Sequence, residues 1–264
     1  MKMRNITGFA SIVIILSSVS LFSGTLTREY NKTVPFREGG TIELKNTNGK
    51  AVIRSWNRDE VKIYAEIKVR CGDRREAEQF MERVEINVRE QGDCLSITTD
   101  YPKKNFGNIF GWLFGKSISV SIAFEIIVPA RSNLDLDLVN GSLEVEDVEG
   151  ESVLETTNGA IKARDLRGMI KAHSTNGSIT ASLLALDKDR AASLSTTNGA
   201  IKLTIPKYVE ADLDAKVVNG RIHSDFDLDV KGRFNSRSVR GRINGGGTMI
   251  DLHSVNGSIS IYGD

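Results

Sequence analysis

Histidine, serine and carboxylate side chains are the groups in this sequence that could move a proton or form a covalent intermediate. A serine nucleophile needs a histidine beside it and a carboxylate that orients the histidine. The serines next to histidines, in His173-Ser174 and His253-Ser254, fall in predicted turns. The histidines share one repeating polar position, whose members are Glu155, His173, Ser195, Lys216, Arg237 and His253. We interpret this position as a solvated face and predict no catalytic residue.

Carboxylates recur at period two in two short runs. Asp135 and Asp137 share one strand face, and Asp225, Asp227 and Asp229 share another. A glycoside hydrolase needs two carboxylates facing each other across a groove, whereas acids at period two are typical of a solvated strand face. A calcium-binding β-roll would need a Gly-Gly-x-Gly-x-Asp pattern, which the turns of this chain do not have. We predict no metal site and no cofactor site.

The two cysteines, Cys71 and Cys94, are the remaining reactive groups. Cys71 ends a predicted strand, Cys94 begins another, and a helix lies between them. In an exported protein two cysteines can pair, so we hypothesise a Cys71–Cys94 disulfide and leave two free thiols as the alternative. Two cysteines with distant histidines do not make a zinc-binding pattern.

The elements that position these residues are set by a glycine repeat. Gly recurs every nine residues at 141, 150, 159, 168 and 177, and alternate members follow Asn, as in Asn158-Gly159. Short runs with period-two alternation separate the turns, which indicates strands. We expect the Asn-Gly pairs to occupy turns in which the backbone has a positive φ, because Gly and Asn tolerate that conformation. The 18-residue unit of two strands and two turns favours a β-solenoid, and an antiparallel meander is the alternative.

The repeat predicts a column of inward side chains, one from each unit. Its predicted members are Leu143, Ile161, Ile179, Ile201, Ile222, Ile243 and Ile259. The pattern resumes after Asn198-Gly199 and Asn219-Gly220, and at Arg240-Gly241, where Arg replaces Asn. The fold class is therefore all-β, a solenoid-like array of short strands with Asn-Gly turns.

The part of the chain before the repeats predicts longer strands and one helix. Val61 to Val69 alternate without a break, and Ile118 to Val128 alternate up to Pro129. Asp73 is a plausible N-cap with Glu76 three residues later, so we expect a helix of about twelve residues between the strands. We divide the chain into a signal peptide (1–24), an N-terminal strand-helix-strand part (25–130) and a β-repeat part (131–264).

The first 24 residues have the order of a secretory signal, with Lys2 and Arg4 before an apolar run from Phe9 to Phe22 and small residues at Ser23-Gly24. An uncleaved anchor is the alternative. We expect an exported protein that is periplasmic, displayed on the cell surface or secreted.

A second apolar segment lies between glycines in the N-terminal part, without strand alternation. Its large apolar residues are Phe106, Ile109, Phe110, Trp112, Leu113 and Phe114. One interpretation is a loop folded over the end of the core. The other is an exposed loop that contacts a membrane or a partner, since large exposed apolar patches mark interaction sites.

Charge is balanced over the 264 residues, with 35 Lys plus Arg against 34 Asp plus Glu. This balance gives no reason to expect nucleic acid as a partner. The distribution is uneven: residues 132–161 hold eight acids and no base, and residues 230–250 hold five bases and no acid. In a solenoid these blocks would lie near opposite ends, roughly 20–25 Å apart.

The chain resembles the bacterial DUF4097 family of putative adhesins. The resemblance is carried by the signal segment, the strand-helix-strand segment from Val61 to Thr99, Val128-Pro129, the Thr-Asn-Gly-x-Ile units and Ile205-Pro206. It implies an exported β-solenoid-like protein without established catalytic residues. We expect a non-enzymatic envelope protein that binds an unidentified envelope component or surface polymer. The alternatives are a carbohydrate-active enzyme on a β-helix and an envelope-stress sensing domain. Oligomeric state stays open.

Overall fold

The computed structural model describes residues 25–102, 118–186, 192–229 and 237–264. These residues form strands and a single helix, which confirms the all-β class with one helix in the N-terminal part. The strands belong to two ten-stranded sheets.

In sheet A they lie in the order β1 (Thr25–Pro35), β4 (Glu60–Arg70), β7 (Ser119–Pro129), β3 (Ala51–Trp56), β9 (Leu143–Glu146), β11 (Ile161–Arg167), β13 (Ile179–Ala185), β15 (Ile201–Ile205), β20 (Ile259–Gly263) and β17 (Ile222–Ser224). In sheet B the order is β18 (Ser238–Ile243), β16 (Ala211–Asn219), β19 (Thr248–Asn256), β14 (Ala192–Asn198), β12 (Ile170–Asn176), β10 (Ser152–Asn158), β8 (Asn133–Asn140), β2 (Thr41–Asn48), β6 (Cys94–Asp100) and β5 (Glu85–Gln91).

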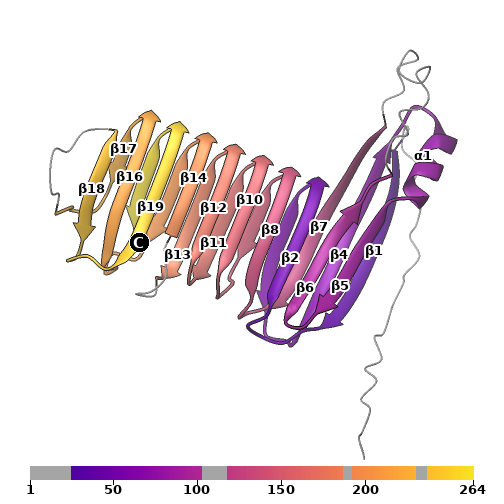
Figure 1. Cartoon of the computed structure of the whole chain (residues 1–264), viewed down its shortest axis with the longest axis horizontal. Coiled ribbons are helices and arrows are strands. Elements are labelled where there is room, and N and C mark those ends of the chain that lie inside the picture. The colour runs from indigo at the N-terminus through magenta and orange to yellow at the C-terminus, as the bar shows by residue number, and fades with distance from the viewer. Residues whose placement is uncertain (1–24, 103–117, 187–191, 230–236) are drawn as a thin grey trace, which may run out of the picture.

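Each repeat is one coil that contributes a strand to each sheet. Strands β8, β10, β12 and β14 pair in parallel, and so do β9, β11, β13 and β15 on the other sheet. Parallel pairing at an 18-residue offset is the geometry of a solenoid, so the meander is excluded. Figure 1 shows the coils side by side as a long array. The first coil is built by β2 and β3, which precede the repeat part of the sequence.

A ladder of asparagines holds one corner of every coil. Each Asn side chain donates from Nδ2 to Oδ1 of the Asn on the next coil at 2.8–2.9 Å. The ladder runs, from donor to acceptor, through Asn219, Asn256, Asn198, Asn176, Asn158, Asn140 and Asn48. Beneath it, buried hydroxyls donate to glycine carbonyls of the neighbouring coil, as Ser174 Oγ does to Gly159 O (2.9 Å). The Asn side chains and the buried hydroxyls thereby bond each coil to the next at this corner.

Aliphatic columns fill the space between the sheets. Leu143, Ile161, Ile179, Ile201 and Ile259 are fully buried in one column, as predicted. Ile222 extends the column but is only half-buried. The prediction for Ile243 was wrong. This residue is buried on β18 in sheet B, because Arg240-Gly241 lies within that strand and is not a turn.

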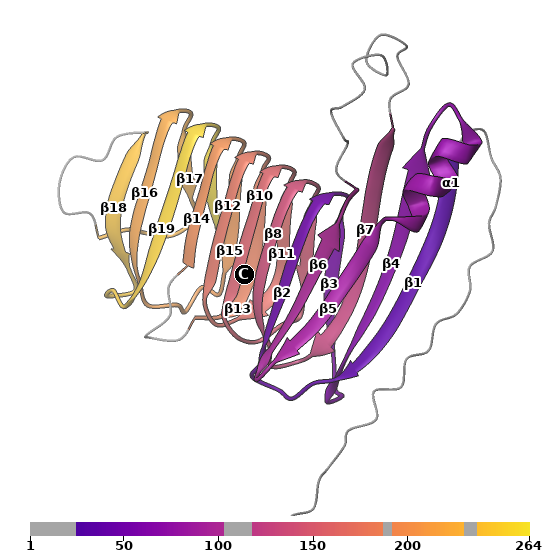
Figure 2. The same cartoon turned by 45° about the vertical axis from the view of Figure 1, so that its right-hand side comes forward.

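The end of the array near the N-terminus is closed by antiparallel strands and the helix. Strands β1, β4 and β7 pair antiparallel in sheet A, and β5 pairs antiparallel with β6 in sheet B. Helix α1 (Arg74–Glu82) covers this end, as Figure 2 shows. Its N-cap is Asp73, whose side chain accepts from the backbone N of Arg75 and Glu76, which confirms the predicted start. The helix is nine residues long, shorter than expected.

Candidate functional site

The parallel register places outward side chains of neighbouring strands in straight rows on sheet A. Arg54 on β3 lies beside Glu146 on β9, which lies beside Arg164 on β11. The row next to it holds Val52, Glu144 and Lys162. Neighbouring strands are about 4.8 Å apart, so side chains in one row are close enough to pair.

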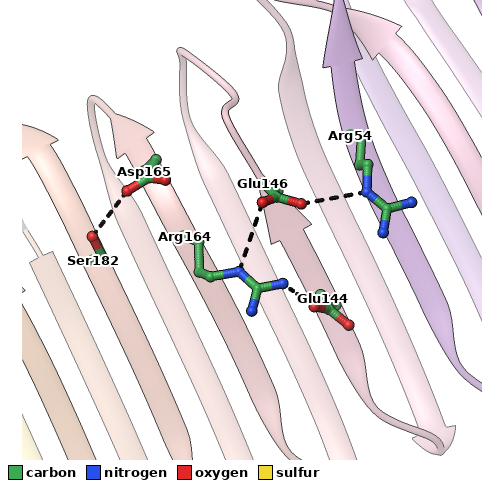
Figure 3. Close-up of polar contacts among 6 residues, drawn as sticks. All are labelled: Arg54, Glu144, Glu146, Arg164, Asp165 and Ser182. Atoms are coloured by element: carbon green, nitrogen blue, oxygen red, sulfur yellow. Dashed lines mark hydrogen bonds and ion pairs between the residues drawn. The ribbon is translucent and has the colours of Figure 1, made fainter.

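These rows form a chain of alternating charges. Arg54 Nε lies 3.3 Å from Glu146 Oε2, and Arg164 Nε lies 3.9 Å from Glu146 Oε1. Arg164 also bonds Glu144, as Figure 3 shows. Both carboxylates therefore have a guanidinium partner. A glycoside hydrolase needs two carboxylates that face each other across the bond to be cleaved, whereas these two carboxylates are bonded to the arginines of neighbouring strands.

A hollow of about 270 Å³ adjoins the row, where sheet A changes from parallel to antiparallel pairing. Register places Arg54, Ile127 and Lys62 in one row across it. The hollow is lined by Asn31, Val52, Arg54, Lys62, Tyr64, Glu125, Ile126 and Ile127. The site thus combines an apolar base with one aromatic ring, two cations, an amide and a carboxylate.

Tyr64 and Lys62 are the groups that can bond a ligand here. Burial raises the pKa of Tyr64 most, and the carboxylates of Glu29 and Glu66 raise it further. The phenol therefore stays protonated; its hydroxyl is hydrogen-bonded with the Glu29 carboxylate, and its oxygen can still accept a bond from a ligand. Lys62 is exposed and forms no ion pair with a carboxylate of the described residues, so its charge is available to an anion. Two further outward lysines lie along the face: Lys162 on β11, and Lys202, whose Nζ lies 4.8 Å from the Tyr262 ring centroid.

Two other hollows have their charges paired within the chain. One, of about 410 Å³, lies at the second corner of the coils and contains Arg131, Glu149 and Arg167. Arg131 bonds Glu38 and Arg167 bonds Asp147. The other, of about 420 Å³, is near the last strands, where Arg240 bonds Asp214 and Arg242 bonds Asp229. Paired cations have less charge to offer a ligand than Lys62.

The outer face of sheet B brings Glu155, His173 and Ser195 into one row across β10, β12 and β14. His173 Nδ1 lies 2.8 Å from Ser195 Oγ. Sequence reasoning noted this polar position, and the structure adds the contact. The backbone N–H groups of these parallel strands donate to neighbouring strands, so they are not available as an oxyanion hole. Ser174 and Ser254, the serines that follow histidines, are buried in strands, not in turns.

The two cysteines are free thiols at opposite ends of the N-terminal sheets. Cys71 is buried beyond the last residue of β4, and its Sγ lies 3.6 Å from Glu76 Oε2. Cys94 begins β6, and the carbonyl of the preceding Asp93 lies beside Gly40, as does the Phe36 ring. Phe36 N donates to Asp59 O, just ahead of β4, so Cys94 lies near the start of that strand. The 11 residues of β4 span over 30 Å. A disulfide needs Cα atoms within about 7 Å, so the hypothesised bond is not formed in this fold.

Burial also affects the chemistry of Cys94. It raises the pKa of the Cys94 thiol, and the hydrogen-bonded carboxylate of Glu43 and the charge of Asp135 raise it further. The thiol is therefore less reactive than a solvated cysteine at neutral pH.

Other predicted features lie outside the described residues: the signal segment 1–24 and the apolar residues Phe106, Ile109, Phe110, Trp112, Leu113 and Phe114. Within the described ranges no three His, Cys, Asp or Glu side chains are grouped to hold a metal ion. In the same ranges no helix has the length and apolar character to cross a bilayer.

Sequence reasoning missed Arg54, Lys62 and Tyr64. The available signal was their outward position in alternating strands, but alternation does not say which strands become neighbours. Lys62 and Arg54 lie in one row only because β7, which comes much later in the chain, lies between β4 and β3.

Comparison with known proteins gives the family and the fold. A family model described as Toastrack DUF4097 matches residues 23–262. A crystal structure described as a putative cell adhesion protein from Clostridium sporogenes has 14% identity and a TM-score of 0.52, covering 90% of this chain and 100% of that one. A putative adhesin from Bacteroides fragilis has 11% identity and a TM-score of 0.44, covering 88% and 96%. At 14% identity the Clostridium sporogenes structure shows the fold alone.

Proposed function

The chain belongs to the Toastrack DUF4097 family, and from that premise we propose that it is an exported, non-enzymatic binding module of the cell envelope. Its binding surface is the outer face of sheet A, and its ligand is an anionic surface polymer. Export rests on the charge and order of residues 1–24. The description of the Clostridium sporogenes structure as a putative cell adhesion protein points in the same direction.

The observation that carries this proposal is the hollow at the end of the charged row. Lys62, which pairs with no carboxylate of the described residues, lies beside the Tyr64 phenol, and Arg54 lies across Ile127 from Lys62. A sugar ring can rest on the apolar base while its hydroxyl and acidic groups bond the rim, which is how small polar ligands are commonly held. Lys162 and Lys202 place further positive charges along the same face, so a linear polymer can contact several coils.

The ion pairs of Glu144 and Glu146 support binding without turnover. Each carboxylate is bonded to Arg164 or Arg54, so the two acids stabilise the face and do not form an acid–base pair. A carbohydrate-active enzyme and a sensing domain are therefore outcomes to be tested, not the function that we propose.

The test is binding of residues 25–264 to a polyuronate (carboxylate), a polyphosphate-linked polymer and neutral dextran, at low and high salt. The variant is Lys62→Ala with Tyr64→Ala. The matched control is Lys171→Ala with Thr175→Ala, which removes the same charge from the outer face of sheet B. We expect salt-sensitive binding to a polyanion, weakened about tenfold in the variant, or about 1.4 kcal/mol, and unchanged in the control.

Two results would contradict the proposal. One is equal loss of binding in variant and control, which would place the ligand elsewhere. The other is release of shortened products from the polymer, which would make the protein an enzyme.

A further inference from the structure

The spatial order of the last coils differs from their order in the chain. Strand β19 lies between β14 and β16, and β20 lies between β15 and β17. The chain therefore builds the coil of β14 and β15, passes on to the outermost coil of β16 and β17 with its edge strand β18, and returns to fill the place between them. Figures 1 and 2 show β19, in yellow, between the orange strands β14 and β16.

This last coil is bound on both sides with full register. Asn256 aligns with Asn198 on one side and with Asn219 on the other. Gly199 N donates to Asn256 O, and Gly257 N donates to Asn219 O, both at 3.0 Å. The inward side chains of the coil are fully buried; they are Ile250, Leu252, Ile259 and Ile261. Since β14 and β16 each pair with β19 instead of with each other, an unfilled place would expose two strand edges and an apolar interior.

A short glycine hinge connects this coil to the rest of the chain. It consists of Asn244, Gly245, Gly246 and Gly247, and the first three have φ of +50°, +95° and +91°. Ile243 and Thr248 both align with Ala211, so the hinge crosses over the start of β16. The crossing is tight, because a Cβ on Gly247 would lie 2.5 Å from Glu210 O.

We propose that residues 248–264 form an exchangeable coil, and that the partner which supplies it is a second copy of this chain. In the reciprocal dimer the coil of each copy occupies the place between β14 and β16 of the other. Every strand pairing, asparagine bond and buried contact of the coil is then the same as in the monomer, and only the hinge changes conformation. A second copy is the occupant that fits, because the place requires aliphatic residues inward, Ser254 bonding Gly199 O (3.0 Å) and Asn256 in the ladder. The dimer would join two binding faces, which raises avidity for a polymer, but its formation does not depend on the proposed function.

The decisive variant deletes Gly245 and Gly246. The hinge must cover two strand spacings, about 9.6 Å, and also pass over the β16 backbone. The shortened path from Ile243 to Thr248 has three Cα–Cα steps, which reach only about 10–11 Å when fully extended. It is therefore too short to pass over the β16 backbone and still cover both strand spacings. We expect the variant to elute as a dimer with twice the monomer mass by light scattering and with wild-type strand content. The control inserts two glycines into the hinge and should be a monomer. A folded monomer with the shortened hinge would overturn the proposal.

A second measurement applies if the shortened variant does not fold. Wild-type chains carrying two different tags are unfolded together and refolded at high protein concentration. We expect mixed dimers that are retained through the first tag, detected through the second, and stable to dilution, because separation requires the coils to leave the core. Mixed species that dissociate within minutes of dilution, or no mixed species among refolded chains, would overturn the proposal.

Discussion

At Gly159 the backbone of one coil meets the backbone of the coil before it. A Cβ at this position would lie 2.0 Å from Gly141 O, and Gly141, Gly177 and Gly199 have the same contact with their own neighbours at 1.9–2.2 Å. The sequence led us to expect positive φ at these turns. Gly159 does not have it, so the expectation was wrong for this residue. Glycine is needed here because adjacent coils approach too closely for any side chain.

Gly159→Ala should therefore destabilise the protein even without backbone strain. We expect a loss of about 1–3 kcal/mol, because the coils must separate locally to admit the methyl group. The control is Gly72→Ala, where an added Cβ meets nothing within 4 Å, and its effect should stay within about 0.5 kcal/mol. Urea unfolding followed by circular dichroism measures both, and equal midpoints would contradict this explanation.

The free thiols give a second prediction at the residue scale. Denatured, unreduced protein should contain two free thiols per chain. In the native protein Cys94 should react with a thiol reagent more slowly at pH 8 than in the denatured chain. Its raised pKa lowers the thiolate fraction, and the reaction should accelerate as pH rises toward that pKa. Finding no free thiol in the denatured chain would show that a Cys71–Cys94 bond does form.

At the scale of the elements, the two corners of the coil differ in whether they can accept additional residues. From Asn158 to Asn176 the spacing is 18 residues, but from Asn176 to Asn198 it is 22. The Asn ladder continues across both steps. In the sequence, β14 begins seven residues after β13 ends, whereas β12 begins three residues after β11 ends. Additional residues do not fit at the Asn corner, because its backbone contacts and side-chain bonds fix the position of each residue.

An insertion should therefore have opposite effects at the two corners. Four Gly/Ser residues after Gly168, at the charged corner, should change stability by less than about 1 kcal/mol, since loop length costs little. The same insertion after Gly159 should cost about 2 kcal/mol or more by breaking ladder bonds on both sides. Thermal melts compare the two proteins, and a larger loss at the charged corner would contradict this distinction.

Elements with a local signal were predictable from the sequence. The glycine spacing gave the parallel coils, and Asp73 gave the start of the helix. Two features had no local signal. Arg240-Gly241 has the spacing of a turn, yet it lies in β18, because β18 pairs antiparallel with β16 at the edge of the sheet. The binding hollow depends on β7 lying between β4 and β3, which is a long-range pairing that periodicity does not encode.

At the scale of the whole molecule, part of each charged block is paired with opposite charges nearby. Glu144, Glu146 and Asp147 bond Arg54, Arg164 and Arg167 of neighbouring coils. In the basic block, Arg240 and Arg242 bond Asp214 and Asp229. Chain order is also not axial order here, since the coil of β19 and β20 precedes that of β16 and β17 along the array. These pairs lower the charge that each block can offer to the opposite end of a second molecule.

The mass of folded protein should for this reason be independent of salt. Sedimentation of one preparation at low and high ionic strength should give the same species at tens of micromolar. Screening weakens contacts between exposed charges, so a mass that falls as salt rises would restore head-to-tail pairing. A swapped dimer, in contrast, would keep its mass in both conditions.

The constant pitch of the coils makes the length of this protein adjustable in whole steps. Asn140, Asn158 and Asn176 are separated by 18 residues each and bond in the same way. Duplicating residues 159–176 would therefore extend the array by one strand spacing, about 4.8 Å. The helix-covered end and the β18 edge would keep their own contacts unchanged. The number of coils therefore sets the separation between the two ends of such a molecule, and that separation can change in evolution by whole coils.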